Sequence, residues 1–94
     1  IVIGKRVKLG GNVKIYDTDF HSIDYKDRAM REDSGIKMMG VKINDDVFIG
    51  AHTIILKGVT IGERSVVGAG SVVTKDIPSD EMWEGNPAKF IRKF

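Results

Sequence analysis

Aliphatic residues recur at a spacing of six along the second half of the chain. The positions are Ile43, Ile49, Ile55, Ile61, Val67 and Val73. A second series stands four residues after each member of the first, at Val47, Thr53, Val59, Ser65, Ser71 and Ile77. A period of six fits neither a helix, with about 3.6 residues per turn, nor the alternation of a simple strand. It is typical of a chain that runs flat, turns and repeats, so both series are expected to point inward in a parallel β-helix.

The repeats group into triangular coils, with three repeats to each coil. Residues 3–20 form a first coil on this count, and residues 43–60 and 61–78 form two more. The step from Ile15 to Ile43 is not a multiple of six, which predicts an insertion over residues 21–42. The insertion is polar and lacks the period, and long loops of this kind often carry function.

The tail, residues 79–94, admits two interpretations. Asn86 and Pro87 are suited to the first positions of a short helix, and they suit a turn into an extended segment equally well. We expect one all-β domain over residues 1–94. Because the chain begins inside a repeat, we also expect it to be a fragment of a longer protein.

Composition narrows the function classes. The net charge of +2 is spread over well-mixed acidic and basic residues, and this does not favour a nucleic-acid partner. The absence of cysteine excludes disulfides, zinc–thiolate sites and cysteine nucleophiles. No apolar run has membrane-spanning length and no signal peptide is visible, so we expect a cytoplasmic protein without a membrane span.

His21 is the first candidate for chemistry because it stands where the repeat breaks. If the preceding residues are extended, Asp17, Asp19 and His21 project to one side. A histidine with its ordinary pKa near 6.5 is a natural general base at neutral pH, but an exposed loop histidine is an equally good interpretation. His52 falls at a repeat corner, where a solvated side chain is expected.

Other chemistries have weaker support. Asp17, Asp19, His21 and Asp24 lack a standard metal-ligand spacing, so no metal site is expected. Ser22 lacks the sequence context of a nucleophile. Residues 68–71, Gly-Ala-Gly-Ser, predict a surface poor in side chains along which a thin ligand fits. Lys75, Lys89, Arg92 and Lys93 form either a solvated basic face or a cradle for phosphates.

Three segments together resemble the hexapeptide-repeat acyltransferases of the maltose and galactoside O-acetyltransferase type, similar to sugar O-acetyltransferases of polysaccharide pathways. They are residues 17–24, DTDFHSID; the repeats from Val47 to Pro78; and residues 85–89, GNPAK. The resemblance covers nearly the whole chain. It implies a left-handed parallel β-helix, a turn at residues 85–87 with an extended end, and a homotrimer with active sites between subunits.

The resemblance also implies a reaction and the residues for it. Acetyl-CoA would give its acetyl group directly to a sugar hydroxyl, with His21 as the catalytic base. Asp17, Asp19, Asp24 and Phe48 are the candidates for acceptor binding, and Asp17 and Asp24 are also candidates for orienting His21. Ala51, Ala69, Thr74, Lys75, Lys89 and Arg92 are the candidates for binding acetyl-CoA.

Two departures from the family pattern bear on the acceptor. Phe48 stands where many relatives carry Trp, and the acceptor-binding Asn of relatives would precede Ile1. Serine O-acetylation, N-acylation of an amino sugar and a non-catalytic trimerisation module are the alternative functions. The small number of histidines argues against a metal-dependent carbonic anhydrase on the same fold, and the presence of His21 in its motif argues against the inactive module.

Overall fold

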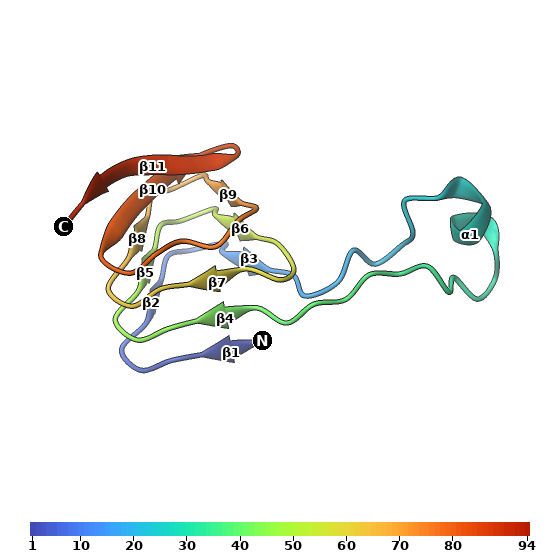
Figure 1. The fold of residues 1–94 in the computed structure, drawn as a ribbon, viewed down its shortest axis with the longest axis horizontal. Coiled ribbons are helices and arrows are strands. Elements are labelled where there is room, and N and C mark those ends of the chain that lie inside the picture. The colour runs from blue at the N-terminus through green and yellow to red at the C-terminus, as the bar shows by residue number, and fades with distance from the viewer.

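Nine short strands wind the chain into a three-sided prism. The computed structural model describes residues 1–94 (Figure 1). The three sides are β1 (Val2–Ile3), β4 (Lys42–Ile43) and β7 (Thr60–Ile61); β2 (Lys8–Leu9), β5 (Phe48–Ile49) and β8 (Val66–Val67); and β3 (Lys14–Ile15), β6 (Ile54–Ile55) and β9 (Val72–Val73). Every neighbour pair within these sides is parallel. The predicted parallel β-helix is therefore confirmed.

The register stacks each inward residue on its equivalent in the next coil. Ile43 pairs with Ile61, Ile49 with Val67 and Ile55 with Val73. All members of both predicted inward series are at most 2% exposed. The prediction of the core is confirmed, because strand pairing at the period of the repeat turns sequence spacing into vertical stacking.

Three polar residues of the second series are buried without losing their hydrogen bonds. The hydroxyl of Thr53 donates to the carbonyl of Gly68 at 3.2 Å, and that of Ser71 donates to the same carbonyl at 2.6 Å. Ser65 donates to the carbonyl of Pro78 at 2.6 Å. Small hydroxyl side chains thus fit the narrow interior and satisfy backbone oxygens at the corners.

Several corners of the prism require a residue with left-handed backbone conformation. His52 has a φ of +61°, and Arg6, Asp46, Arg64 and Asp80 lie in the same left-handed region. His52 is exposed, which confirms its predicted place at a solvated corner. Gly50 is required for a different reason, because a Cβ there would lie 2.5 Å from the backbone nitrogen of Ala69 in the next coil.

An antiparallel hairpin, β10 (Glu81–Gly85) and β11 (Ala88–Lys93), closes one end of the prism. β10 continues the sheet by pairing with β8, and Trp83 and Ala88 pack against the buried core. The turn at residues 85–87 and the extended end are as expected from the resemblance. The short helix that the sequence also allowed does not form, because β10 offers strand partners to every residue of 88–93 except Ile91, which lies at a bulge.

The insertion projects from the prism as a paired arm, defined here as residues 17–40 (Figure 1). Thr18 pairs with Met38, and the backbone N–H groups of Asp19 and Met39 donate to Lys37 and Asp17 at 3.0 Å each. A short helix, α1 (Tyr25–Ala29), lies at its far end. The arm starts at Asp17 rather than at His21 because the pairing begins before the histidine, and it ends before β4 resumes the prism at Lys42.

Candidate functional site

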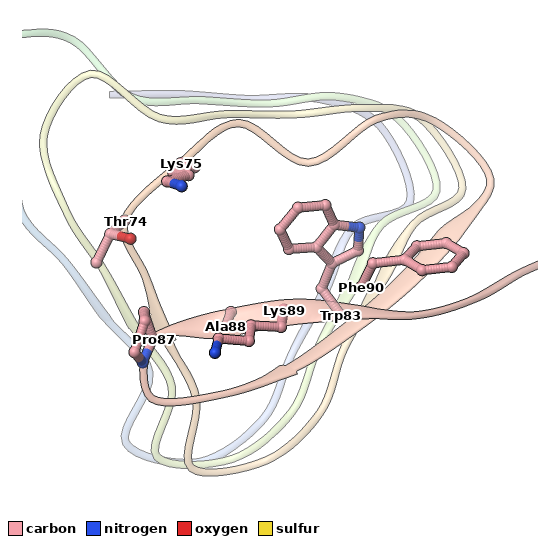
Figure 2. Close-up of a pocket in the computed structure, with 7 residues that line it drawn as sticks. All are labelled: Thr74, Lys75, Trp83, Pro87, Ala88, Lys89 and Phe90. Atoms are coloured by element: carbon pink, nitrogen blue, oxygen red, sulfur yellow. The ribbon is translucent and has the colours of Figure 1, made fainter.

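A pocket of about 330 Å³ lies where the hairpin meets the last coil (Figure 2). Its lining residues are Thr74, Lys75, Trp83, Pro87, Ala88, Lys89 and Phe90. Thr74, Lys75 and Lys89 were predicted to bind acetyl-CoA, and the structure brings these three together although β10 and the hairpin turn lie between Lys75 and Lys89 in sequence. Two ammonium groups and an aromatic wall make the pocket suited to a ligand that is both anionic and partly apolar.

The hairpin turn is anchored on the last coil. The N–H of Gly85 donates to the hydroxyl of Ser71 at 3.1 Å, and Ala88 is only 8% exposed. Trp83 packs against the core, and its indole N–H donates to Glu81 at 3.0 Å. Sequence reasoning did not select Trp83 for the site. The available signal was the only tryptophan of the chain, in a tail that had to cover an open end of the prism.

A strip of small residues runs down one corner of the prism. Ala51 and Ala69 occupy equivalent places in successive coils, and the N–H of Gly70 donates to the carbonyl of Ala51 at 2.8 Å. Ala69 is exposed, and a Cβ built on Gly70 would meet nothing within 4 Å. The predicted surface poor in side chains is therefore open at residues 69–70, whereas Glu84 covers Gly68 and Ser71 is buried.

Two predicted ligand-binding residues lie outside the pocket lining. The guanidinium of Arg92 stands 5.4 Å from the ring centre of Phe94. Phe48 is 49% exposed and pairs with Lys8 and Val66 on the outer side of its sheet. The structure thus groups part of the predicted set in the pocket and leaves Arg92 and Phe48 outside its lining.

His21 lies on the arm with its side chain 72% exposed. The expected alternation of Asp17, Asp19 and His21 along an extended strand is wrong, because Phe20 takes a φ of +67°. This residue turns the chain so that the N–H of His21 donates to the carbonyl of Asp19 at 2.7 Å. His21 therefore leaves the strand direction of the arm instead of continuing it.

The acidic residues predicted around His21 have other contacts. Asp19 pairs with Lys57 of the prism at 3.1 Å, and Asp24 caps α1 by accepting from the N–H of Lys26 at 2.8 Å. Asp17 lies at the root of the arm. The carboxylate that faces His21 is Asp33, whose Oδ2 is 4.0 Å from the imidazole Nδ1.

Asp33 was missed because it comes twelve residues after His21 in sequence. The signal that was present is a local one: Asp33 precedes Ser34 and Gly35, and its carboxylate accepts from the N–H of Gly35 at 3.2 Å, as in a common turn. That pattern predicts a turn at residues 33–35. It does not predict that the arm folds back to place the turn beside His21.

The two halves of the predicted site do not meet within one chain. The pocket lies under the hairpin, and the arm extends away from the prism (Figure 1). No group of three or more His, Asp or Glu side chains is placed to hold a metal ion. The one helix, α1, has five residues, and nothing in the structure is a helix long and apolar enough to cross a membrane.

Known proteins of similar sequence share this repeat. Residues 40–75 match the family model of the bacterial transferase hexapeptide, six repeats. A candidate acetyltransferase of Schizosaccharomyces pombe is 51% identical over 94 residues, which are 99% of this chain and 43% of that protein. The galactoside O-acetyltransferase of Escherichia coli is 38% identical over 93 residues, which are 99% of this chain and 44% of that protein.

A solved structure agrees with the same grouping. The hexapeptide-repeat acetyltransferase of Vibrio cholerae, complexed with acetyl coenzyme A, superposes with a TM-score of 0.85 at 41% identity. The match covers 97% of this chain and 49% of that one, so this chain spans less than half the length of these relatives.

The fold is thus the left-handed parallel β-helix of hexapeptide-repeat proteins, as the sequence predicted. Residues 40–75 carry the bacterial transferase hexapeptide repeat, and the whole chain is similar to part of the galactoside and maltose O-acetyltransferases.

Proposed function

We propose that the protein containing this chain is an acetyl-CoA-dependent O-acetyltransferase that acts on a sugar hydroxyl. The observation that carries the proposal is the pocket that joins Thr74, Lys75 and Lys89 beneath the hairpin. The relatives support it, because one solved neighbour is a complex with acetyl coenzyme A and another relative is named a galactoside O-acetyltransferase.

Different pocket residues bind different parts of the acetyl-CoA donor in this proposal. Lys75 and Lys89 attract the phosphates of acetyl-CoA, while Trp83 and Phe90 offer an apolar surface at the same place. The open strip at Ala51, Ala69 and Gly70 gives the thin pantetheine arm a path along the prism. Arg92 remains a predicted contact of acetyl-CoA, and Phe48 remains a predicted contact of the acceptor.

His21 is the proposed general base, and no acyl-enzyme is needed. The imidazole Nε2 takes the proton of the acceptor hydroxyl as its oxygen forms a bond to the thioester carbonyl carbon. The resulting oxyanion collapses, the carbon–sulfur bond breaks, and the CoA thiolate leaves with the proton returned by the imidazolium. The products are the acetylated sugar and free CoA. Asp17, Asp19 and Asp24 stay predictions for acceptor contacts.

A homotrimer completes the site in this proposal. The arm carries His21 away from the pocket of its own chain, so a neighbouring subunit has to supply the other half. Three-fold closure also covers a flat side of the prism, where Phe48 is exposed, and gives the exposed apolar arm residues Ile23 and Met38 a surface to pack against.

The test is an acceptor screen with the full-length protein. Mass spectrometry detects transfer of an acetyl group to members of a sugar panel, and a thiol reagent detects free CoA. His21→Asn is expected to lower the turnover by about 10²- to 10⁴-fold. His52→Asn is the matched control, because His52 is a corner residue and Asn12 occupies the corresponding corner of the preceding coil. Equal turnover in His21→Asn and the wild type would remove His21 as the base.

Subunit mixing tests the shared site. The variant His21→Asn and the double variant Lys75→Glu, Lys89→Glu are each expected to be inactive. Trimers re-formed from a mixture of the two are expected to regain activity, because some interfaces then combine an intact histidine with an intact pocket. A mixture as inactive as its components, despite verified subunit exchange, would show that the site is not shared.

A further inference from the structure

The interior of the arm holds a carboxylate that no part of the proposed chemistry uses. The side chain of Asp33 is 8% exposed, although the arm around it is largely open to solvent. It accepts hydrogen bonds from the N–H of Ser22 at 2.7 Å, from the hydroxyl of Ser22, and from the N–H of Gly35 at 3.2 Å. Ser22 is itself 4% exposed.

These donors keep Asp33 ionised. The hydrogen bonds from Ser22 lower the pKa of the Asp33 carboxyl below its ordinary value, and the bond from Gly35 and the nearby His21 act in the same direction. No Lys or Arg is paired with the carboxylate; the guanidinium of Arg28 donates instead to the carbonyls of Ser22 and Ile23. The negative charge therefore remains available to a further partner.

The free partner is His21. Its Nδ1 is 4.0 Å from Oδ2 of Asp33, the oxygen that also accepts from the N–H of Ser22. The imidazole is 72% exposed, and catalytic hydrogen bonds are often long in proteins without bound substrate. Because Ser22 follows His21 directly, the bonds from Ser22 to Asp33 also fix the backbone that carries the imidazole.

We propose that Asp33 is a positioning residue, which holds the neutral imidazole of His21 with its proton on Nδ1 and leaves Nε2 unprotonated and directed outward. This is the tautomer a general base needs, because Nε2 then has a lone pair for the acceptor proton. The catalytic consequence rests on the proposed function. The tautomer itself does not, so the two ideas fail separately.

Nitrogen NMR tests the tautomer without any substrate. Full-length protein labelled with ¹⁵N-histidine is measured at a pH where the imidazoles are neutral, and the spectrum of His21→Gln identifies the signals of His21. The expected result is the Nδ1–H tautomer of His21 in the wild type and a shift towards Nε2–H in Asp33→Asn, because the amide then presents a donor or a weaker acceptor. His52 is the internal control and is expected to keep its signals.

Kinetics test the consequence. Asp33→Asn is expected to lower kcat by about 10- to 100-fold with the KM for acetyl-CoA unchanged, since the donor site lies elsewhere. Glu32→Gln removes an exposed neighbouring carboxylate and is expected to keep the wild-type kcat. Circular dichroism of both variants checks that the arm and prism are folded.

Two results would overturn the positioning role. One is an Nε2–H tautomer of His21 in the wild type, and the other is a tautomer that does not change in folded Asp33→Asn. If the tautomer behaves as expected while His21→Asn keeps full turnover, the positioning role stands and the proposed catalytic base is wrong.

Discussion

The prism and the arm are built on opposite principles. Every inward position of the prism between Ile43 and Ile77 is at most 2% exposed, whereas Ile23 and Met38 of the arm are 86% and 73% exposed. The prism gains stability by stacking equivalent apolar side chains. The arm is held by hydrogen bonds around Asp33 and by the pair of Asp19 with Lys57. The regular region thus supplies rigidity, and the irregular region is free to carry polar groups in special positions.

The largest difference in stability between prism and arm is expected when one isoleucine in each region is replaced by alanine. Ile61→Ala is expected to lower the free energy of unfolding by about 2 to 5 kcal/mol, because it leaves a cavity in a core that is closed on all sides. Ile23→Ala in the arm is expected to change it by less than about 0.5 kcal/mol. Denaturant unfolding at one fixed protein concentration measures both. Equal losses would mean that the arm packs in the assembled protein as the core does.

A corner glycine of the prism tests close stacking of the coils. Gly50→Ala places a Cβ against the backbone of Ala69 and is expected to cost about 1 to 3 kcal/mol. Gly11→Ala is the matched control, since a Cβ there meets nothing within 4 Å and its backbone is not left-handed. Thermal unfolding compares the two variants. A wild-type melting temperature for Gly50→Ala would show that the coils are able to separate locally without loss.

Loss of a buried hydroxyl group in the prism is expected to have a smaller effect on stability, which again exceeds that of an equivalent change in the arm. Ser65→Ala removes the hydrogen bond to the carbonyl of Pro78 and is expected to cost about 1 kcal/mol. Ser34→Ala, at an exposed position in the arm, is expected to be neutral within the error of the measurement. Denaturant midpoints at neutral pH provide the values, and a loss in Ser34→Ala as large as in Ser65→Ala would contradict the contrast.

Acid pH is expected to have the smallest effect. The hydrogen bond and the charge of Arg6 lower the pKa of Asp46 below its ordinary value of 3.8, and those of Arg64 lower the pKa of Asp80 in the same way. A lowered folded-state pKa adds stability above that ordinary value, and the contribution disappears as the pH falls through the lowered pKa. Asp80→Asn is therefore expected to flatten the fall in stability below about pH 4. The measurement is denaturant unfolding across this range, and an unchanged pH profile in Asp80→Asn would contradict the prediction.

The arm also contains a carboxyl group with a lowered pKa. The pKa of Asp33 is lowered as well, but by Ser22 and Gly35 within the arm. Protonation of Asp33 is therefore expected to loosen the arm before the prism unfolds. Hydrogen exchange of the arm amides at acid pH separates the two events.

Most of the prism was predictable because its rule is repeated. The inward series, the three coils and the corner at His52 all follow from one spacing, and each repeat confirms the others. The candidate site was only partly predictable. Thr74, Lys75 and Lys89 were selected from the resemblance and do share a pocket. Trp83 and Phe90 also line it, but they lie in the tail, where no repeat predicts their positions.

The arm shows why the rest was not predictable. The alternation expected for Asp17, Asp19 and His21 failed at a single residue, Phe20, whose left-handed backbone no local pattern indicates. Asp24, the acidic residue nearest in sequence after His21, caps a helix instead of facing the imidazole. Asp33 takes that place because the arm turns back on itself.

The sequence by itself therefore determined the β-helix and its core, because a periodic core depends on spacing along the chain. Only the tertiary structure decided which carboxylate faces His21, and that the pocket and the histidine lie on separate parts of one chain. Those relations depend on where an aperiodic loop turns and on how a hairpin folds over the last coil. Both are contacts between residues far apart in sequence, and spacing carries no information about them.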